Sequence, residues 1–130
     1  MALEIERKFL LMETPADLVD HPGTSIRQGY LSVSENAEVR LRDKGGRFFE
    51  AVKIGRGLVR KEFQVELDRP QFEALWPATE GQRLEKIRYR IEVGGHVLDV
   101  DVFGGRLTGL MVVEVEFGNE RDAVDFVPLT

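Results

Sequence analysis

Charged residues alternate with apolar residues along several segments of this chain, and within most of these segments the charges have one sign. Around Arg40 and Arg42, for example, Val39 and Leu41 occupy the intervening positions. Residues i and i+2 of a β-strand point to the same face, so this period of two predicts strands with one charged and one apolar face. The pattern recurs at residues 4–8, 40–42, 62–66, 86–90, 99–101 and 114–116.

Turn-forming residues divide the chain into about eight short strands. Gly45-Gly46 and Gly94-Gly95 are the clearest of these turns. Strands are expected at residues 3–12, 25–34, 37–43, 48–54, 59–68, 83–93, 97–103 and 111–117. A meandering antiparallel sheet of this size usually closes, because closure removes its exposed edges. The predicted fold class is therefore mainly β (α+β), an eight-stranded antiparallel barrel in a single domain over residues 1–130.

Short helices are expected at three places. Pro70 suits the first position of a helix over residues 70–76, in which Phe72 and Trp76 fall on one face. Thr14 and Pro15 are expected to cap and begin a short turn or helix. Residues 121–126 are expected to form a last short helix. All of these helices are expected to pack outside the barrel.

A sheet with one face on a core and one face in water would show the same alternation. Two observations favour charges inside a barrel instead. Like charges at i and i+2 lie about 7 Å apart and repel, and a face that serves solubility alone would mix both signs. Separate acidic and basic strands also make chemical sense, because carboxylates hold hard divalent cations and basic side chains hold phosphate oxygens. A charged lumen needs ion pairs or a ligand to offset its charge.

Composition excludes several classes of function. The chain has no cysteine, which excludes disulfides, a thiol nucleophile and a cysteine-ligated zinc site. No apolar run reaches the roughly 18 residues of a membrane span, and the N-terminus lacks the layout of a signal peptide, so a cytoplasmic location is expected. The net charge of −5 on its face argues against a polyanion partner, but the distribution of charge matters more than its sum, because basic residues could be gathered in one place. His21 and His96 fall in expected turns and are assigned no role.

Several short motifs follow one another along nearly the whole chain. Residues 4–8 read Glu-Ile-Glu-Arg-Lys, which fits an E-x-E-x-K signature. The other motifs are RQGYL at 27–31, VRLR at 39–42, AVKI at 51–54, RKEF at 60–63, LEKIRY at 84–89, LDVDVF at 98–103 and LMVVEVEF at 110–117. Together they resemble the CYTH superfamily, also called the triphosphate tunnel metalloenzymes. The resemblance implies an antiparallel tunnel that binds a small-molecule triphosphate and two divalent metal ions, Mg²⁺ or Mn²⁺.

The resemblance also implies roles for individual residues. The expected metal ligands are acidic: Glu4, Glu6, Asp101, Glu114 and Glu116. The expected phosphate-binding residues are basic: Lys8, Arg40, Arg42, Lys53, Lys86 and Arg88. The expected catalytic residues are Glu62, which would orient a water, Tyr30, which would touch a terminal phosphate or order a water, and Lys86. Gln64 departs from the family, in which a second glutamate is common at this position.

The end of the sequence is a second departure from the family. Relatives commonly continue with a Trp-Gly-rich turn and a helix that packs at one end of the tunnel, whereas this sequence stops after residues 127–130. We therefore expect a tunnel that lacks this helix. If the helix is needed for catalysis, the chain is expected to be inactive.

The leading functional prediction is metal-dependent hydrolysis of inorganic tripolyphosphate to pyrophosphate and phosphate, without a covalent nucleophile. Thiamine triphosphatase, nucleoside triphosphatase and class IV adenylyl cyclase activities stay open as alternatives, as does a polyphosphate- or nucleotide-binding module without turnover. A thiamine ring would need an aromatic platform near the tunnel mouth, but Trp76 is interpreted as packing of the 70–76 helix. No membrane or nucleic-acid partner is expected, and a homodimer is left open.

Overall fold

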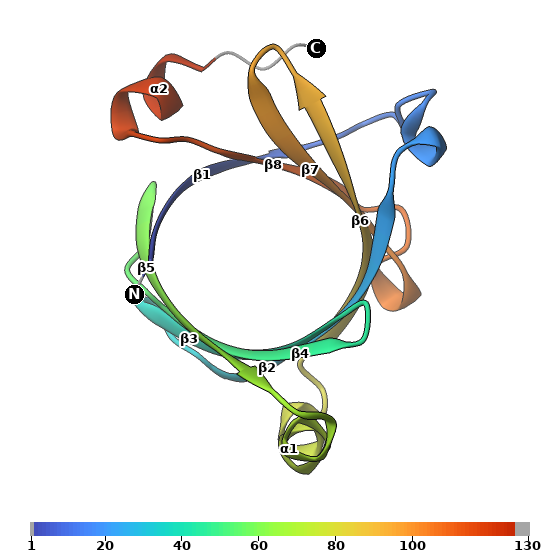
Figure 1. The fold of residues 1–130 in the computed structure, drawn as a ribbon, viewed down its shortest axis with the longest axis vertical. Helices are drawn as coiled ribbons and strands as arrows, with labels where there is room; N and C mark the ends of the chain where they lie inside the picture. Colours follow the sequence, from blue (N-terminus) through green and yellow to red (C-terminus); the bar gives the residue numbers. More distant parts are fainter. Residues whose placement is uncertain (1, 127–130) are drawn as a thin grey trace.

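Eight antiparallel strands form a closed barrel in the computed structural model, which describes residues 2–126 (Figure 1). Around the barrel the strands follow the order β1-β5-β4-β3-β2-β6-β7-β8. Their bounds are β1 (Ala2–Leu10), β2 (Gly23–Val33), β3 (Ala37–Lys44), β4 (Arg47–Ile54), β5 (Val59–Leu67), β6 (Arg83–Val93), β7 (His96–Phe103) and β8 (Met111–Glu116). The predicted fold class is confirmed, and each predicted strand overlaps one observed strand.

The barrel closes through its first strand. The first half of β1 pairs with β5, where Glu4 lies opposite Arg60, and the second half pairs with β8, where Glu6 lies opposite Glu116. On the other side of the barrel, β3 and β6 both pair antiparallel with β2, so they run parallel to each other. Rows of side chains on β3 and β6 therefore advance toward the same end of the barrel.

Two short α-helices lie outside the barrel, α1 (Arg69–Leu75) and α2 (Glu120–Asp125), together with the 3₁₀ helices η1 (Leu18–Asp20), η2 (Trp76–Thr79) and η3 (Gly105–Leu107) (Figure 1). The start of α1 is set by Asp68, whose carboxylate accepts a hydrogen bond from the backbone N–H of Gln71, while the Gln71 side chain accepts one from the backbone N–H of Asp68. This reciprocal capping box satisfies two donors that would otherwise be unpaired at a helix start. The predicted helices at residues 70–76 and 121–126 are confirmed.

The prediction that a short turn begins at Pro15 is confirmed, because the backbone N–H of Leu18 donates to the Pro15 carbonyl at 3.2 Å, but the prediction that Thr14 caps it is wrong. The Thr14 hydroxyl donates instead to the sulfur of Met111, at 3.4 Å, and the helical turn begins at Leu18. Leu18 is buried among outward-facing residues of the barrel, including Val100 and Val113. Packing of this side chain, rather than a capping hydroxyl, accompanies the turn in this segment.

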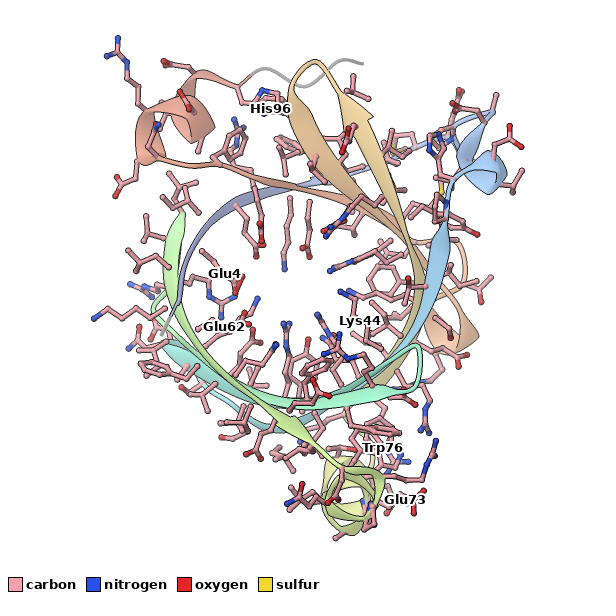
Figure 2. All side chains as sticks on the ribbon, in the orientation of Figure 1. Glu4, Lys44, Glu62, Glu73, Trp76 and His96 are labelled. Atoms are coloured by element: carbon pink, nitrogen blue, oxygen red, sulfur yellow. The ribbon has the colours of Figure 1, made fainter. Side chains whose placement is uncertain are left out.

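The apolar core lies between the barrel and its outer helices. One cluster joins Leu41 and Phe48 of the barrel to Phe72 of α1, and Trp76 stacks on Phe72 with 5.0 Å between ring centroids. Figure 2 shows Trp76 on the outside of the barrel, which confirms its interpretation as helix packing. A second cluster, around Leu18, Val100, Val113 and Val115, covers the outer face of β7 and β8.

Because the apolar faces pack outward, the charged faces line the inside. The solvent-face alternative for the alternating charges is therefore wrong. Among residues 2–126, no helix has the length and apolar character needed to cross a membrane. Residues 127–130, which carry the expectation about the C-terminal end, lie outside the described residues.

Candidate functional site

Charged side chains from seven of the strands point into the barrel and line a cavity of about 330 Å³ (Figure 2). The charged lining residues are Glu4, Glu6, Arg40, Arg42, Lys44, Lys53, Glu62, Arg88, Arg90, Asp99, Glu114 and Glu116. The acidic residues come mainly from β1 and β8, and the basic residues mainly from β3 and β6. Most of the residues that the sequence predicted as a site are therefore brought together in one lumen.

Three carboxylates form the acidic side of the tunnel. Glu4, Glu6 and Glu116 each offer a carboxylate oxygen, and these oxygens lie within 4.8 Å of one another. Burial and the charge of nearby Glu114 raise the pKa of Glu6 above its usual value. Neither Glu6 nor Glu116 has a basic partner among residues 2–126. Three carboxylate oxygens this close together match the donor set that a hard divalent cation takes.

Glu114 differs from these three carboxylates, because basic residues face it. Lys8 Nζ lies 3.5 Å from Glu114 Oε1, and Arg88 Nη2 lies 3.4 Å from Glu114 Oε2. Burial alone would raise the pKa of Glu114, but the charges of Arg88 and Lys8 outweigh burial and lower it. Glu114 therefore stands where the acidic and the basic sides of the tunnel meet.

Lys53 bridges two glutamates on neighbouring strands. Its Nζ lies 3.1 Å from Glu4 Oε2 and 3.7 Å from Glu62 Oε2. Burial and the adjacent Glu4 raise the pKa of Glu62 to about 6. The other Glu4 oxygen, Oε1, is buried and finds no donor among the described residues while Glu62 is ionised. A hydrogen bond between Glu62 and Glu4, which requires a proton on Glu62, is a further reason for the raised pKa of Glu62.

Asp101 anchors two of the predicted phosphate-binding residues. It accepts a hydrogen bond from Lys86 Nζ at 2.6 Å and two from the Arg88 guanidinium at 2.8 and 2.9 Å. Asp101 is 1% exposed, and both of its oxygens are engaged in this way. Burial lowers the pKa of Lys86 to about 8, although the charge of Asp101 opposes the shift. The structure thus places Asp101 against basic residues, apart from the group formed by Glu4, Glu6 and Glu116.

Arg40 and Arg42 of β3 have different surroundings. Arg40 is buried, and its Nε–H has no acceptor within the described part of the chain. Arg42 donates from Nε and Nη2 to the side-chain oxygen of Gln28, at 2.9 and 2.7 Å. Burial and the charges of Arg40 and Arg88 lower the pKa of Arg42 to about 10. Arg42 therefore lies close to two further positive charges, those of Arg40 and Arg88.

Tyr30 joins this group through the same glutamine. The Gln28 amide nitrogen donates to the Tyr30 hydroxyl at 2.6 Å. Gln28 is 2% exposed, and sequence reasoning assigned it no role although it lies within the RQGYL motif. A signal was present, because Gln28 is two residues from Tyr30 on the same face of β2.

Sequence reasoning also assigned no role to Lys44, Arg90 and Asp99, which line the same cavity. The period of two marks all three, since each continues a charged row by one step: Lys44 follows Arg42, Arg90 follows Arg88, and Asp99 precedes Asp101. Gln64, the departure from the family pattern, is exposed and lies opposite Ala51 of β4.

The fold and site define a class of protein: a closed antiparallel barrel whose lumen holds an acidic group beside two basic rows. Comparison with known proteins agrees with this class. An inorganic triphosphatase from Nitrosomonas europaea is 45% identical over 127 residues, which cover 96% of this chain and 83% of the relative. A crystal structure of an inorganic triphosphatase matches with a TM-score of 0.69 and 42% identity, covering 99% of this chain and 83% of that one.

A more distant structure, that of a putative adenylate cyclase from Bacillus halodurans, matches with a TM-score of 0.65 at 17% identity, over 95% of this chain and 86% of that one. This similarity concerns the fold alone. No protein-family model matches the chain. The chain belongs to the family of inorganic triphosphatases with a tunnel fold, the triphosphate tunnel metalloenzymes of the CYTH superfamily.

Proposed function

We propose that this chain hydrolyses inorganic triphosphate to pyrophosphate and phosphate inside its tunnel. The observation that carries the proposal is the separation of charge in the lumen: carboxylates on β1 and β8 lie beside arginine rows on β3 and β6. A linear triphosphate with bound cations complements both sides, because its cations face the carboxylates and its phosphates face the arginines. The 45% identity to a protein named inorganic triphosphatase supports the same substrate class.

The proposal includes divalent metal, Mg²⁺ or Mn²⁺, with two ions as the expected number. Glu4, Glu6 and Glu116 would hold one ion, and Glu114 lies next to them on β8. Asp101 stays a predicted ligand, although its oxygens face Lys86 and Arg88. A bound ion of this type offsets phosphate charge and lowers the pKa of a coordinated water.

The basic residues would bind the phosphates. Arg40 has a buried, unused donor, and a phosphate oxygen would satisfy it. Arg42 and Arg88 are held in place by Gln28 and Asp101, so little of their side-chain freedom would be lost on binding. Lys8 and Lys53 would contribute further charge. Prearranged donors of this kind stabilise the charge that develops on phosphate oxygens during transfer.

Three residues would act nearer the reacting bond. Lys86 Nζ, with its pKa lowered to about 8, is suited to give a proton to the leaving pyrophosphate oxygen near neutral pH. Tyr30 would orient a terminal phosphate through its hydroxyl, which Gln28 positions. Glu62, with its raised pKa, would accept a proton from the attacking water.

The test is a panel of substrates and metals. Phosphate release is measured from tripolyphosphate, thiamine triphosphate and ATP, each with Mg²⁺, Mn²⁺ or EDTA. We expect metal-stimulated release that is fastest from tripolyphosphate. Cyclic AMP as the main product from ATP, or tight tripolyphosphate binding without release, would contradict the proposal and favour a cyclase or a binding module.

A pair of variants makes this test specific to the tunnel. Glu6→Gln removes a carboxylate from the acidic group, and Glu73→Gln removes the same charge from the outer face of α1 (Figure 2). Only Glu6→Gln should abolish the metal-stimulated release. A homodimer stays a prediction.

A further inference from the structure

Each of the two basic rows of the tunnel contains one more residue than the proposed triphosphate site uses. On β3 the row runs Arg40, Arg42, Lys44, and on β6 it runs Lys86, Arg88, Arg90. Both strands pair antiparallel with β2, so the third residue of each row lies toward the same end of the barrel. From first to third residue each row advances about 13 Å along its strand.

Lys44 and Arg90 also line a second cavity, of about 590 Å³, at this end of the barrel. The second cavity shares Lys44, Arg88, Arg90 and Asp99 with the tunnel cavity. The two spaces therefore adjoin at these four residues. We call the second cavity the outer chamber.

Lys44 is distinguished from the other lumenal lysines by its lack of a carboxylate partner. Lys8, Lys53 and Lys86 lie 3.5, 3.1 and 2.6 Å from carboxylate oxygens, whereas Lys44 has no ion pair among residues 2–126. Figure 2 shows Lys44 pointing into the lumen. Burial and the charges of Arg88, Arg42 and Arg90 lower the pKa of Lys44. An anion at this position would offset that repulsion.

Arg90 of β6 provides donors to the same outer chamber that Lys44 of β3 lines. Its Nε donates to Asp99 Oδ1 at 3.3 Å, and its side chain is 64% exposed. A guanidinium has five N–H donors, so this contact leaves donors free for a second acceptor. Asp99 and Glu92 add negative charge to the chamber, and Lys44, Arg88 and Arg90 exceed them in number.

We propose that Lys44 and Arg90 form an outer phosphate subsite that binds one further phosphoryl group of a linear polyphosphate longer than triphosphate. This inference rests on the proposed function, because the inner rows must hold the first three phosphates. The substrate class of the tunnel then extends from tripolyphosphate to inorganic tetraphosphate. The free end of the longer chain lies in the outer chamber, where Arg88 links the inner and outer sites.

The experiment compares kcat/KM for tetraphosphate and tripolyphosphate in the unchanged protein, Lys44→Gln and Arg90→Gln. Lys61→Gln is the matched control, because Lys61 is exposed on β5 and lies opposite the outward-facing Ile54. We expect Lys44→Gln to lower kcat/KM for tetraphosphate about tenfold more than kcat/KM for tripolyphosphate, which corresponds to roughly 1.4 kcal/mol. Arg90→Gln should act in the same direction, and Lys61→Gln should leave the ratio of the two values unchanged.

Two results would overturn the inference. Lys44→Gln and Arg90→Gln could lower kcat/KM for tetraphosphate and for tripolyphosphate equally. That result would indicate general attraction of anions rather than a subsite. The unchanged protein could neither cleave tetraphosphate nor be inhibited by it. Failure of tripolyphosphate hydrolysis alone would instead count against the proposed function. In that case the ratio of the two dissociation constants, measured by titration calorimetry without metal, still tests the subsite through the same variants.

Discussion

The guanidinium of Arg42 makes both of its side-chain hydrogen bonds to one acceptor, the amide oxygen of Gln28, at 2.9 and 2.7 Å. The two residues lie directly opposite each other on β3 and β2. The amide nitrogen of Gln28 then donates to Tyr30 at 2.6 Å. A neutral side chain thus orients an arginine and a tyrosine toward the same space without neutralising the arginine, which keeps its full charge for a phosphate.

Replacement of Gln28 by leucine should disturb substrate binding through Arg42. Gln28→Leu leaves Arg42 and Tyr30 without their buried partner, and an unsatisfied buried polar group costs about 1–3 kcal/mol. We expect a rise in KM for tripolyphosphate of roughly tenfold or more, with a smaller change in kcat. Gln82→Leu, in the exposed loop before β6, is the matched control. A KM for Gln28→Leu within twofold of the unchanged protein would contradict the role of Gln28.

The raised pKa of Glu62 predicts a pH-dependent gain in stability for Glu62→Gln. The folded pKa of about 6 lies above the ordinary value of 4.5, so between these values the folded protein binds a proton that the unfolded chain has released. The ionised carboxylate therefore destabilises the fold fully above pH 6, and this cost is lost as the pH falls toward 4.5. At pH 7.5 Glu62→Gln should stabilise the protein by about 1–2 kcal/mol.

Urea unfolding in EDTA at pH 4.5, 6 and 7.5 measures this effect. EDTA is needed because a bound cation would itself offset the charge of Glu62. The difference between the two proteins should shrink toward zero at pH 4.5. A difference that is constant with pH would show that Glu62 titrates with an ordinary pKa in the folded protein.

Divalent cations should stabilise the fold through the acidic group of the tunnel. A ligand present at 100 times its dissociation constant adds about 2.7 kcal/mol to the free energy of unfolding. We expect Mg²⁺ or Mn²⁺ to raise the melting temperature by several degrees, and Glu116→Gln to remove most of this rise. Glu73→Gln on the outer face of α1 should retain it. An equal metal-dependent rise in Glu116→Gln would place the cation elsewhere.

Asp101→Asn should destabilise the protein even without substrate. Asp101 is 1% exposed and is the shared partner of Lys86 and Arg88, so its loss leaves two buried positive charges without their nearest counter-charge. Removal of one partner from a buried ion pair costs about 3–5 kcal/mol. Chemical denaturation checks this value against Asp125→Asn on exposed α2. A loss below about 1 kcal/mol would mean that Asp101 is not a structural anchor.

The strands and the charged rows could be predicted from sequence because the period of two is local. Arg40 and Arg42 share a face whatever the rest of the chain does. Which face points inward is not local, since it depends on closure and on the apolar cover from Phe72 and Leu18. The pairing of Asp101 with Lys86 could not be predicted from the sequence either, because it depends on the register between β6 and β7.

Gln28 and Lys44, which the sequence did not predict as site residues, show what a pattern of charges cannot detect. Gln28 carries no charge, so a search for charged rows passes over it, although its amide organises two site residues. Tyr30 reaches Gln28 next to an irregularity in the register of β2 and β3 between Tyr30 and Ser32, which no periodic pattern predicts. Lys44 was missed because the predicted strand ended at residue 43, whereas β3 extends through Lys44.

Closure of the barrel through β1 has a consequence for how the chain folds. Glu6 of β1 must pair with Glu116 of β8, which is distant in the sequence, before the ring is complete. Contacts between distant residues slow folding, because the chain must lose much entropy before they form. The group of Glu4, Glu6 and Glu116 requires this pairing, because its members come from β1 and β8. Cation affinity should therefore appear late in refolding, as a reporter of the completed ring.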